Sequence, residues 1–209
     1  MNLFHREKYF QTQQLLKDFV LNYSGSPQVD SAQFYLGRCT FELEDNLTAA
    51  DEFKRVVSQY PFSKLVGDAA YWEARSYFEQ SPAYGLDQTC TKQALDAFQR
   101  YLEDYAGHAL NDSAYQYITQ CRNKLARKEY SSAKLYYDLG EYASSVLYGD
   151  GILANYYDTQ WAEPAQYLKA RCFDALGNHT RARQEYETYL EKYPSGKHAG
   201  TARRALASL

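Results

Sequence analysis

The hydrophobic and polar positions of this chain follow a helical spacing, in stretches that each end at a tyrosine. These tyrosines occupy equivalent positions in successive units: Tyr23, Tyr60, Tyr105, Tyr156 and Tyr193. Pro61 and Pro194 follow two of them directly, and proline both lacks a backbone N–H and disfavours helix in the residue before it. The pattern therefore predicts an all-α chain of stacked, antiparallel helical pairs.

Two units carry the clearest form of this repeat. In one, Leu36-Gly37 is followed by Ala49, then Phe53, then Pro61. The other has the same arrangement, with Ala170, Ala182, Tyr186 and Pro194. Small residues suit the point where two helices cross closely, and large residues fill the space beside them. The arrangement resembles the tetratricopeptide repeat, which implies a superhelix of about ten antiparallel helices.

The register predicts one array over residues 1–209. Its units are 4–27 (partial), 30–63, 67–107, 110–159 and 162–207. A loop insertion is expected at 81–85, and one long helix from about 110 to 139, where neither Gly nor Pro intervenes. Residues 4–22 match a second helix of a pair, so we expect the natural chain to have a partner helix before Met1.

The overall charge narrows the classes of partner. The net charge is −3, with 45% hydrophobic and 23% charged residues, so neither nucleic-acid binding nor an electrostatic membrane contact is expected. No apolar run approaches the roughly 18 residues of a membrane helix.

Three of the four cysteines stand at one position of the repeat. Cys39, Cys121 and Cys172 are equivalent, and Ser76 takes the same place in another unit. A position shared by Cys and Ser indicates packing of a small side chain. Cys90 lies at the inserted loop. With no C-x2-C pair, no metal site is expected.

An aromatic residue and a basic residue, four positions apart, recur on the first helices of four units. The pairs are Phe34 and Arg38, Tyr71 and Arg75, Tyr130 and Lys134, and Tyr167 and Arg171. Residues four apart share a helix face, and first helices line the concave surface of such arrays. One hypothesis is a groove for a peptide, in which arginines hold carboxylates. The alternative is that the cations pair with Glu42, Glu73 and Glu79 and the rings pack between repeats.

Nothing in the sequence indicates catalysis. The four histidines are scattered, and Gly149-Asp150-Gly151 is no phosphate loop because no Gly-Lys-Ser or Gly-Lys-Thr follows. We expect no enzyme activity and no cofactor.

Several segments are similar to the BamD family of the bacterial outer-membrane β-barrel assembly machinery. They are 125–133 (LARKEYSSA), 136–140 (YYDLG), 150–153 (DGIL) and 156–159 (YYDT). The resemblance implies a non-catalytic scaffold, lipid-anchored on the periplasmic face of the outer membrane. Its implied partners are the periplasmic domains of BamA, other lipoproteins of the machinery, and C-termini of unfolded barrel proteins. The family often carries a basic residue where this chain has Tyr148, so Tyr148 and Asp150 are the candidates on the BamA side.

Two other classes of protein remain open from the sequence. One is a different periplasmic repeat adaptor, of the cell-division or Tol-Pal coordination type. The other is an accessory repeat domain of a larger regulatory protein or enzyme. Sequence before Met1 would separate the BamD-type scaffold, with its lipid-bearing cysteine, from the other periplasmic adaptor, with its coiled coil. The full-length gene would expose any second domain.

Overall fold

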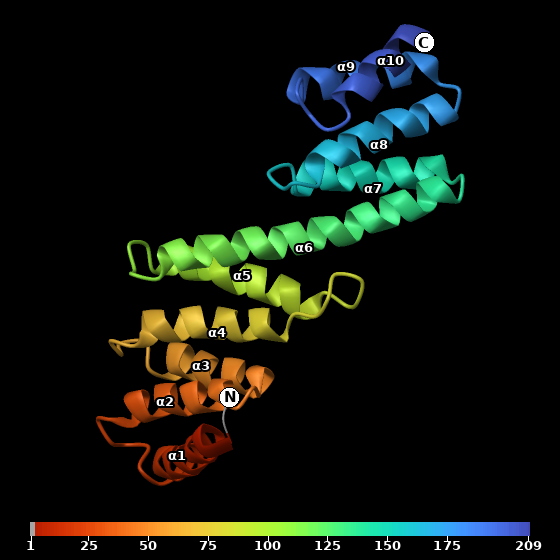
Figure 1. Ribbon diagram of the computed structural model, residues 1–209. Helices are drawn as coiled ribbons and strands as arrows, with labels where there is room; N and C mark the ends of the chain where they lie inside the picture. Colours follow the sequence, from red (N-terminus) through yellow and green to blue (C-terminus); the bar gives the residue numbers. More distant parts are fainter. Residues whose placement is uncertain (1–2) are drawn as a thin grey trace. The chain divides into compact units, whose positions relative to one another are not determined.

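The computed structural model describes residues 3–209, with side chains from Glu7 onward, and this part of the chain is all-helical. Figure 1 shows its ten helices. They are α1 (Leu3–Asn22), α2 (Val29–Glu42), α3 (Asn46–Gln59), α4 (Val66–Gln80), α5 (Thr89–Asp104), α6 (Asn111–Asp138), α7 (Tyr142–Asn155), α8 (Ala162–Ala175), α9 (His179–Lys192) and α10 (Ala199–Ser208). The predicted all-α repeat fold is confirmed.

Contacts group the chain into two compact units, one up to Cys121 and one from Arg122 onward. In the first unit α1 packs on α2, α2 on α3, α3 on α4 and α4 on α5. In the second unit α7 packs on α8, α8 on α9 and α9 on α10. Neighbours in sequence are thus neighbours in space, as expected of a repeat protein. The organisation of residues 1–209 as one continuous array stays a prediction.

The recurring tyrosine ends a helix each time. Tyr60, Tyr105, Tyr156 and Tyr193 are the C-caps of α3, α5, α7 and α9, with φ between −132° and −125°. Each donates its backbone N–H to the carbonyl four residues earlier and accepts from the N–H three residues later. Tyr23, directly after α1, makes the same two bonds. One hydrogen-bonded turn therefore links successive helical pairs, and the predicted role of the tyrosine is confirmed.

A second kind of turn joins the two helices inside a pair. It needs a residue in the left-handed region, supplied by Glu44 (φ 67°), Gly140 (φ 82°) and Gly177 (φ 71°). The next helix then starts at a side-chain cap in two of the pairs. Asp45 accepts from Thr48 N at 3.4 Å, and Asn178 accepts from Arg181 N at 3.2 Å. These caps satisfy N–H groups that a helix start leaves without partners.

Close helix crossing explains the small residues of the repeat. A Cβ atom at Gly37 would lie 2.9 Å from two ring carbons of Phe53, so α2 and α3 approach each other as only glycine permits here. Phe53 is fully buried. In the last pair Ala170, Ala182 and Tyr186 belong to one hydrophobic cluster. The tetratricopeptide-type packing read from the sequence is confirmed at both places.

The two irregular features of the repeat have the expected positions. α6 runs from Asn111 to Asp138, close to the long helix expected at about 110–139. The insertion is a loop of residues 81–88 between α4 and α5. Its shape is held by Gln88, a buried side chain that donates to the carbonyl of Ala83 at 2.9 Å.

The shared cysteine position is a packing position. Cys39, Cys121, Cys172 and Ser76 are all buried, whereas Cys90 is half-buried in the first turn of α5. Burial raises the pKa of the Cys39 and Cys172 thiols, which lowers their reactivity at neutral pH.

Helix α1 packs on α2 through its less exposed face. Gln13 donates to the Thr40 hydroxyl at 2.8 Å, and Leu16, Phe19 and Val20 are partly buried. The expected additional helix before Met1 lies outside the described residues and stays a prediction.

Candidate functional site

The aromatic members of the four predicted pairs are buried in the hydrophobic core or pack against it. Phe34 and Tyr71 are each only 6% exposed, and Phe34 packs on Phe53 with ring centroids 5.6 Å apart. Tyr130 and Tyr167 are partly buried against the clusters of the second unit. For Phe34 and Tyr71 this corrects the expectation of rings facing a groove, because these rings fill the space beside the small crossing residues.

The arginines of the first unit stack on rings from the following first helix instead. The Arg38 guanidinium carbon lies 3.7 Å from the centroid of Trp72, and that of Arg75 lies 4.3 Å from the centroid of Tyr117. Both distances are well within the range of cation–π attraction. The Nε atoms of both arginines are buried and hydrogen-bonded to no described residue. Stacking therefore fixes the plane of each guanidinium group.

Each of these arginines also faces an acid one turn later on its own helix. Arg38 contacts Glu42 at 3.4 Å, and Arg75 forms an ion pair with Glu79. The side chains of the arginines remain 33% and 26% exposed, respectively. The alternative in which neighbouring acids hold the cations thus matches the contacts of Glu42 and Glu79, whereas Glu73 faces Arg100 of α5 at 3.8 Å. Any peptide carboxylate would have to compete with Glu42 and Glu79.

The basic members of the second unit behave differently from one another. Arg171 lies 4.5 Å from the centroid of Tyr137 and donates to its hydroxyl at 2.7 Å. Lys134 is largely exposed and pairs with Asp138 at 2.8 Å. Their role as partner-binding residues stays a prediction, but Arg171 is the more rigidly held of the two.

The BamA-side candidates Tyr148 and Asp150 lie on α7 and point to different neighbouring helices. Tyr148 stacks on Tyr136 of α6, with centroids 5.3 Å apart and planes at 22°. Asp150 pairs with Lys169 of α8 at 2.7 Å and keeps 52% of its side chain exposed. Different neighbouring helices therefore fix the orientations of the two side chains.

Lys169 is the residue that holds Asp150, and sequence reasoning did not single it out. Its side chain is 13% exposed and also contacts Glu185 of α9 at 2.9 Å. Burial alone would lower the pKa of Lys169, but hydrogen bonds to Asp150 and Glu185 outweigh burial and leave the pKa raised. Lys169 is charged in the fold and ties three helices together.

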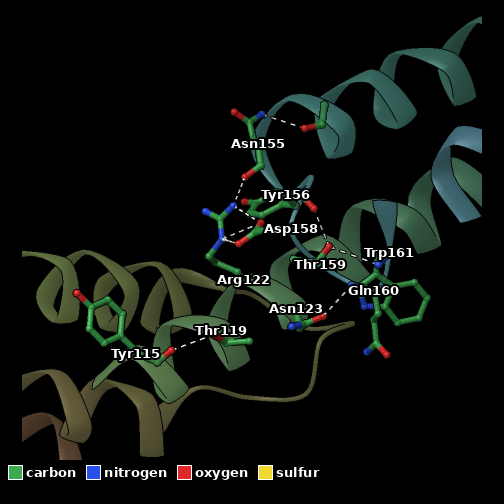
Figure 2. A network of polar contacts seen from close by, with 11 residues as sticks. Tyr115, Thr119, Arg122, Asn123, Asn155, Tyr156, Asp158, Thr159, Gln160 and Trp161 are labelled. Carbon is green, nitrogen blue, oxygen red and sulfur yellow. Dashed lines mark hydrogen bonds and ion pairs between the residues drawn. The ribbon is translucent and has the colours of Figure 1, made fainter. Parts of the chain in front are cut away.

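A polar network around Arg122 fixes the turn between α7 and α8 (Figure 2). From α6, Arg122 donates to both carboxylate oxygens of Asp158, with distances of 2.9 Å to Oδ2 and 2.5 Å to Oδ1, and to the carbonyl of Asn155 at 2.7 Å. The hydrogen bond from Arg122 lowers the pKa of Asp158. Nearby, Asn123 accepts from the backbone N–H of Gln160 at 3.4 Å.

This network contains the 156–159 segment quoted above. Thr159 caps the turn by donating to the carbonyl of Tyr156 at 2.8 Å, while Tyr157 is left 70% exposed. The sequence alone could not identify Arg122 as the partner of Asp158, because the two residues lie far apart along the chain and Arg122 stands at no special position of the repeat.

Among the side chains described, from Glu7 onward, no three His, Cys, Asp or Glu lie together as a metal ion would require. In the same part of the chain no helix is both long enough and apolar enough to cross a membrane.

The fold defines a helical repeat protein of the tetratricopeptide type. Residues 2–188 match the family model YfiO, described as an outer membrane lipoprotein. The chain therefore belongs to this family, which is of the BamD type. A comparison with individually curated proteins found no match.

Proposed function

We propose that this protein is a non-catalytic scaffold of the machinery that assembles β-barrel proteins in the outer membrane. In this role it is anchored by an N-terminal lipid on the periplasmic face, and its C-terminal repeats bind the periplasmic domains of BamA. Its family membership supports this proposal, because the family is one of outer membrane lipoproteins.

The observation that carries the BamA contact is a set of exposed apolar side chains on α6 and α7. Leu135 is 58% exposed and Leu147 71%, and they are next in sequence to the stacked pair Tyr136 and Tyr148. Leu139, directly after α6, is 66% exposed. Large exposed apolar side chains are typical of protein interaction sites, and tyrosine is favoured at their energetic centres. The half-exposed carboxylate of Asp150 adds a charged contact held by Lys169.

The test uses the purified protein and the purified periplasmic domains of BamA in a quantitative binding assay. We expect Leu147→Asp to weaken binding at least about tenfold, because the charge must be desolvated in the contact. Leu21→Asp on α1 is the matched control, since Leu21 is 70% exposed and Leu147 is 71% exposed. Equal affinities of the two variants, or no binding by the unmodified protein, would contradict the proposal.

The second part of the proposal is that the first unit recognises C-termini of unfolded barrel proteins. Arg38 and Arg75 support it, because stacking presents both guanidinium groups in fixed planes. We expect the double variant Arg38→Ala, Arg75→Ala to bind a barrel-protein C-terminal peptide more weakly than the unmodified protein does. Affinity for the amidated peptide should be unchanged by the substitutions. Normal binding of the free-acid peptide by the double variant would contradict this part of the proposal.

A further inference from the structure

The second unit contains a cavity of about 440 Å³ that no site discussed so far uses. It lies where α6, the start of α8 and the turn before α10 meet. Its lining includes Tyr130, Trp161, Glu163, Pro164, Lys197 and His198. A cavity of this size is in the range of known ligand pockets and holds one or two side chains of a partner.

One wall of the cavity is apolar. Trp161 and Tyr130 pack together with ring centroids 5.3 Å apart and planes at 34°, and Pro164 lies beside them. The indole N–H of Trp161 is buried and finds no acceptor among the described residues. Leaving a buried donor without a partner is unfavourable, so a ligand that supplied an acceptor would gain from meeting it.

The opposite side of the cavity favours a negative group. Lys197 is exposed and makes no ion pair with the described residues. The nearby carboxylate of Glu163 already accepts from the Tyr189 hydroxyl at 2.7 Å. Gly196 leaves room for this carboxylate, because a Cβ atom there would lie 2.5 Å from Glu163 Oε1. Glu163 is thus held by the protein, whereas Lys197 is available.

Two helix starts add to this preference. α8 begins after Trp161 and α10 begins after His198, and neither of these N-cap residues provides a side-chain cap. Both are lining residues of the cavity. Helix N-termini carry partial positive charge and attract anions, so they reinforce the effect of Lys197.

We propose that this cavity binds a short peptide segment in which a carboxylate stands next to an aromatic side chain. The aromatic ring lies on Trp161 and Tyr130, and the carboxylate pairs with Lys197. This inference rests on the proposed role as a protein-binding scaffold and adds the chemistry of one bound segment. The carboxylate could be an aspartate or glutamate side chain or the end of a chain, and the probes below separate these sources.

The test measures binding of three small probes by titration calorimetry on the purified protein. N-acetyl-Asp-Phe-amide has a side-chain carboxylate, N-acetyl-Phe has a terminal carboxylate, and N-acetyl-Asn-Phe-amide has neither. We expect at least one acidic probe to bind at least about fivefold more tightly than the neutral one. The stronger of the two acidic probes identifies the source of the carboxylate.

Two variants locate the bound probe. Lys197→Ala should reduce affinity for the acidic probe to that of the neutral one, whereas Lys192→Ala, an exposed lysine at the end of α9, should leave it unchanged. In a Trp72→Phe background Trp161 is the only tryptophan, so its fluorescence must change on binding. If that variant does not fold, quenching of the unmodified protein by a brominated probe gives the same information.

Three results would overturn the proposal: no binding of any probe, equal binding of neutral and acidic probes, or unchanged binding by Lys197→Ala. Failure here is distinguishable from failure of the proposed function, because binding to the BamA periplasmic domains is measured separately with the Leu147 variant.

Discussion

Substitution of Gly37 by alanine tests whether close helix crossing, and not helix propensity, decides the residue at this position. In an open helical site Gly→Ala stabilises by about 1 kcal/mol, because alanine loses less backbone freedom on folding. At Gly37 the added Cβ would lie 2.9 Å from two ring carbons of Phe53, a side chain with 0% exposure and therefore no room to move.

The gain from helix propensity and the cost of the clash with Phe53 oppose each other. Their relative sizes decide whether Gly37→Ala stabilises or destabilises the protein. Overpacking in a tight core costs about 1–3 kcal/mol. Ala170 occupies the equivalent position in the last pair, so helices of this repeat can accommodate a methyl group there with a small adjustment. We therefore expect Gly37→Ala to destabilise the protein by a net amount of about 1 kcal/mol.

The assay is thermal unfolding followed by circular dichroism at 222 nm. For a chain of this size a change of about 1 kcal/mol shifts Tm by about 2–4 °C, so Gly37→Ala should lower Tm by that amount. Gly151→Ala is the matched control, because Gly151 also lies inside a helix but has no atom within 4 Å of a Cβ placed there. It should raise Tm by about 2–4 °C.

A second variant separates the clash from other causes. Phe53→Leu alone should destabilise by loss of buried area, but combined with Gly37→Ala it should remove the overlap. The double-mutant cycle should therefore show a favourable coupling of about 1 kcal/mol. If Gly37→Ala raises Tm as much as Gly151→Ala does, helix propensity and not close crossing decides the residue at this position.

Three further outcomes are expected. Glu44 has φ 67°, where Gly140 and Gly177 serve in the other pairs, so Glu44→Gly should stabilise by about 0.5–1 kcal/mol in chemical denaturation; a loss of stability would show that its side chain matters more than the backbone. Arg122 lowers the pKa of Asp158, so the carboxylate stabilises the fold above its unfolded pKa of about 3.9, and this contribution is lost as pH falls through the lower folded pKa. The stability difference between the unmodified protein and Asp158→Asn should therefore be constant above about pH 5 and shrink below about pH 4; a difference independent of pH would contradict it. Finally, a thiol reagent should label the half-buried Cys90 well before the three buried cysteines, and mass spectrometry of the native protein would expose the reverse order.

The register of the repeat could be predicted from the sequence because it depends on interactions between residues that are close together along the chain. Each recurring tyrosine ends a stretch of helical periodicity, and Pro61 and Pro194 end helices by their own backbone chemistry. The long helix α6 followed from a stretch without Gly or Pro. The shared position of Cys39 and Ser76 indicated packing because equivalent positions in a repeat have equivalent surroundings.

The environment of the candidate site was decided only by the tertiary structure. The sequence placed Phe34 and Arg38 on one helix face, but whether a ring is buried and which ring an arginine stacks on depend on the neighbouring helix. The partners Arg122 and Asp158, and Lys169 and Asp150, lie on different helices, and no local periodicity relates them. The same holds for the cavity at Trp161 and Lys197.

The sequence by itself thus determined the helices, their ends and the order of small and large packing positions, because hydrogen-bonded turns and helical periodicity act over a few residues. The tertiary structure determined which side chains remain accessible to a partner. Burial and ion pairing are properties of surfaces that come together only when helical pairs stack, so residues with the same place in the repeat, such as Arg75 and Lys134, have different surroundings.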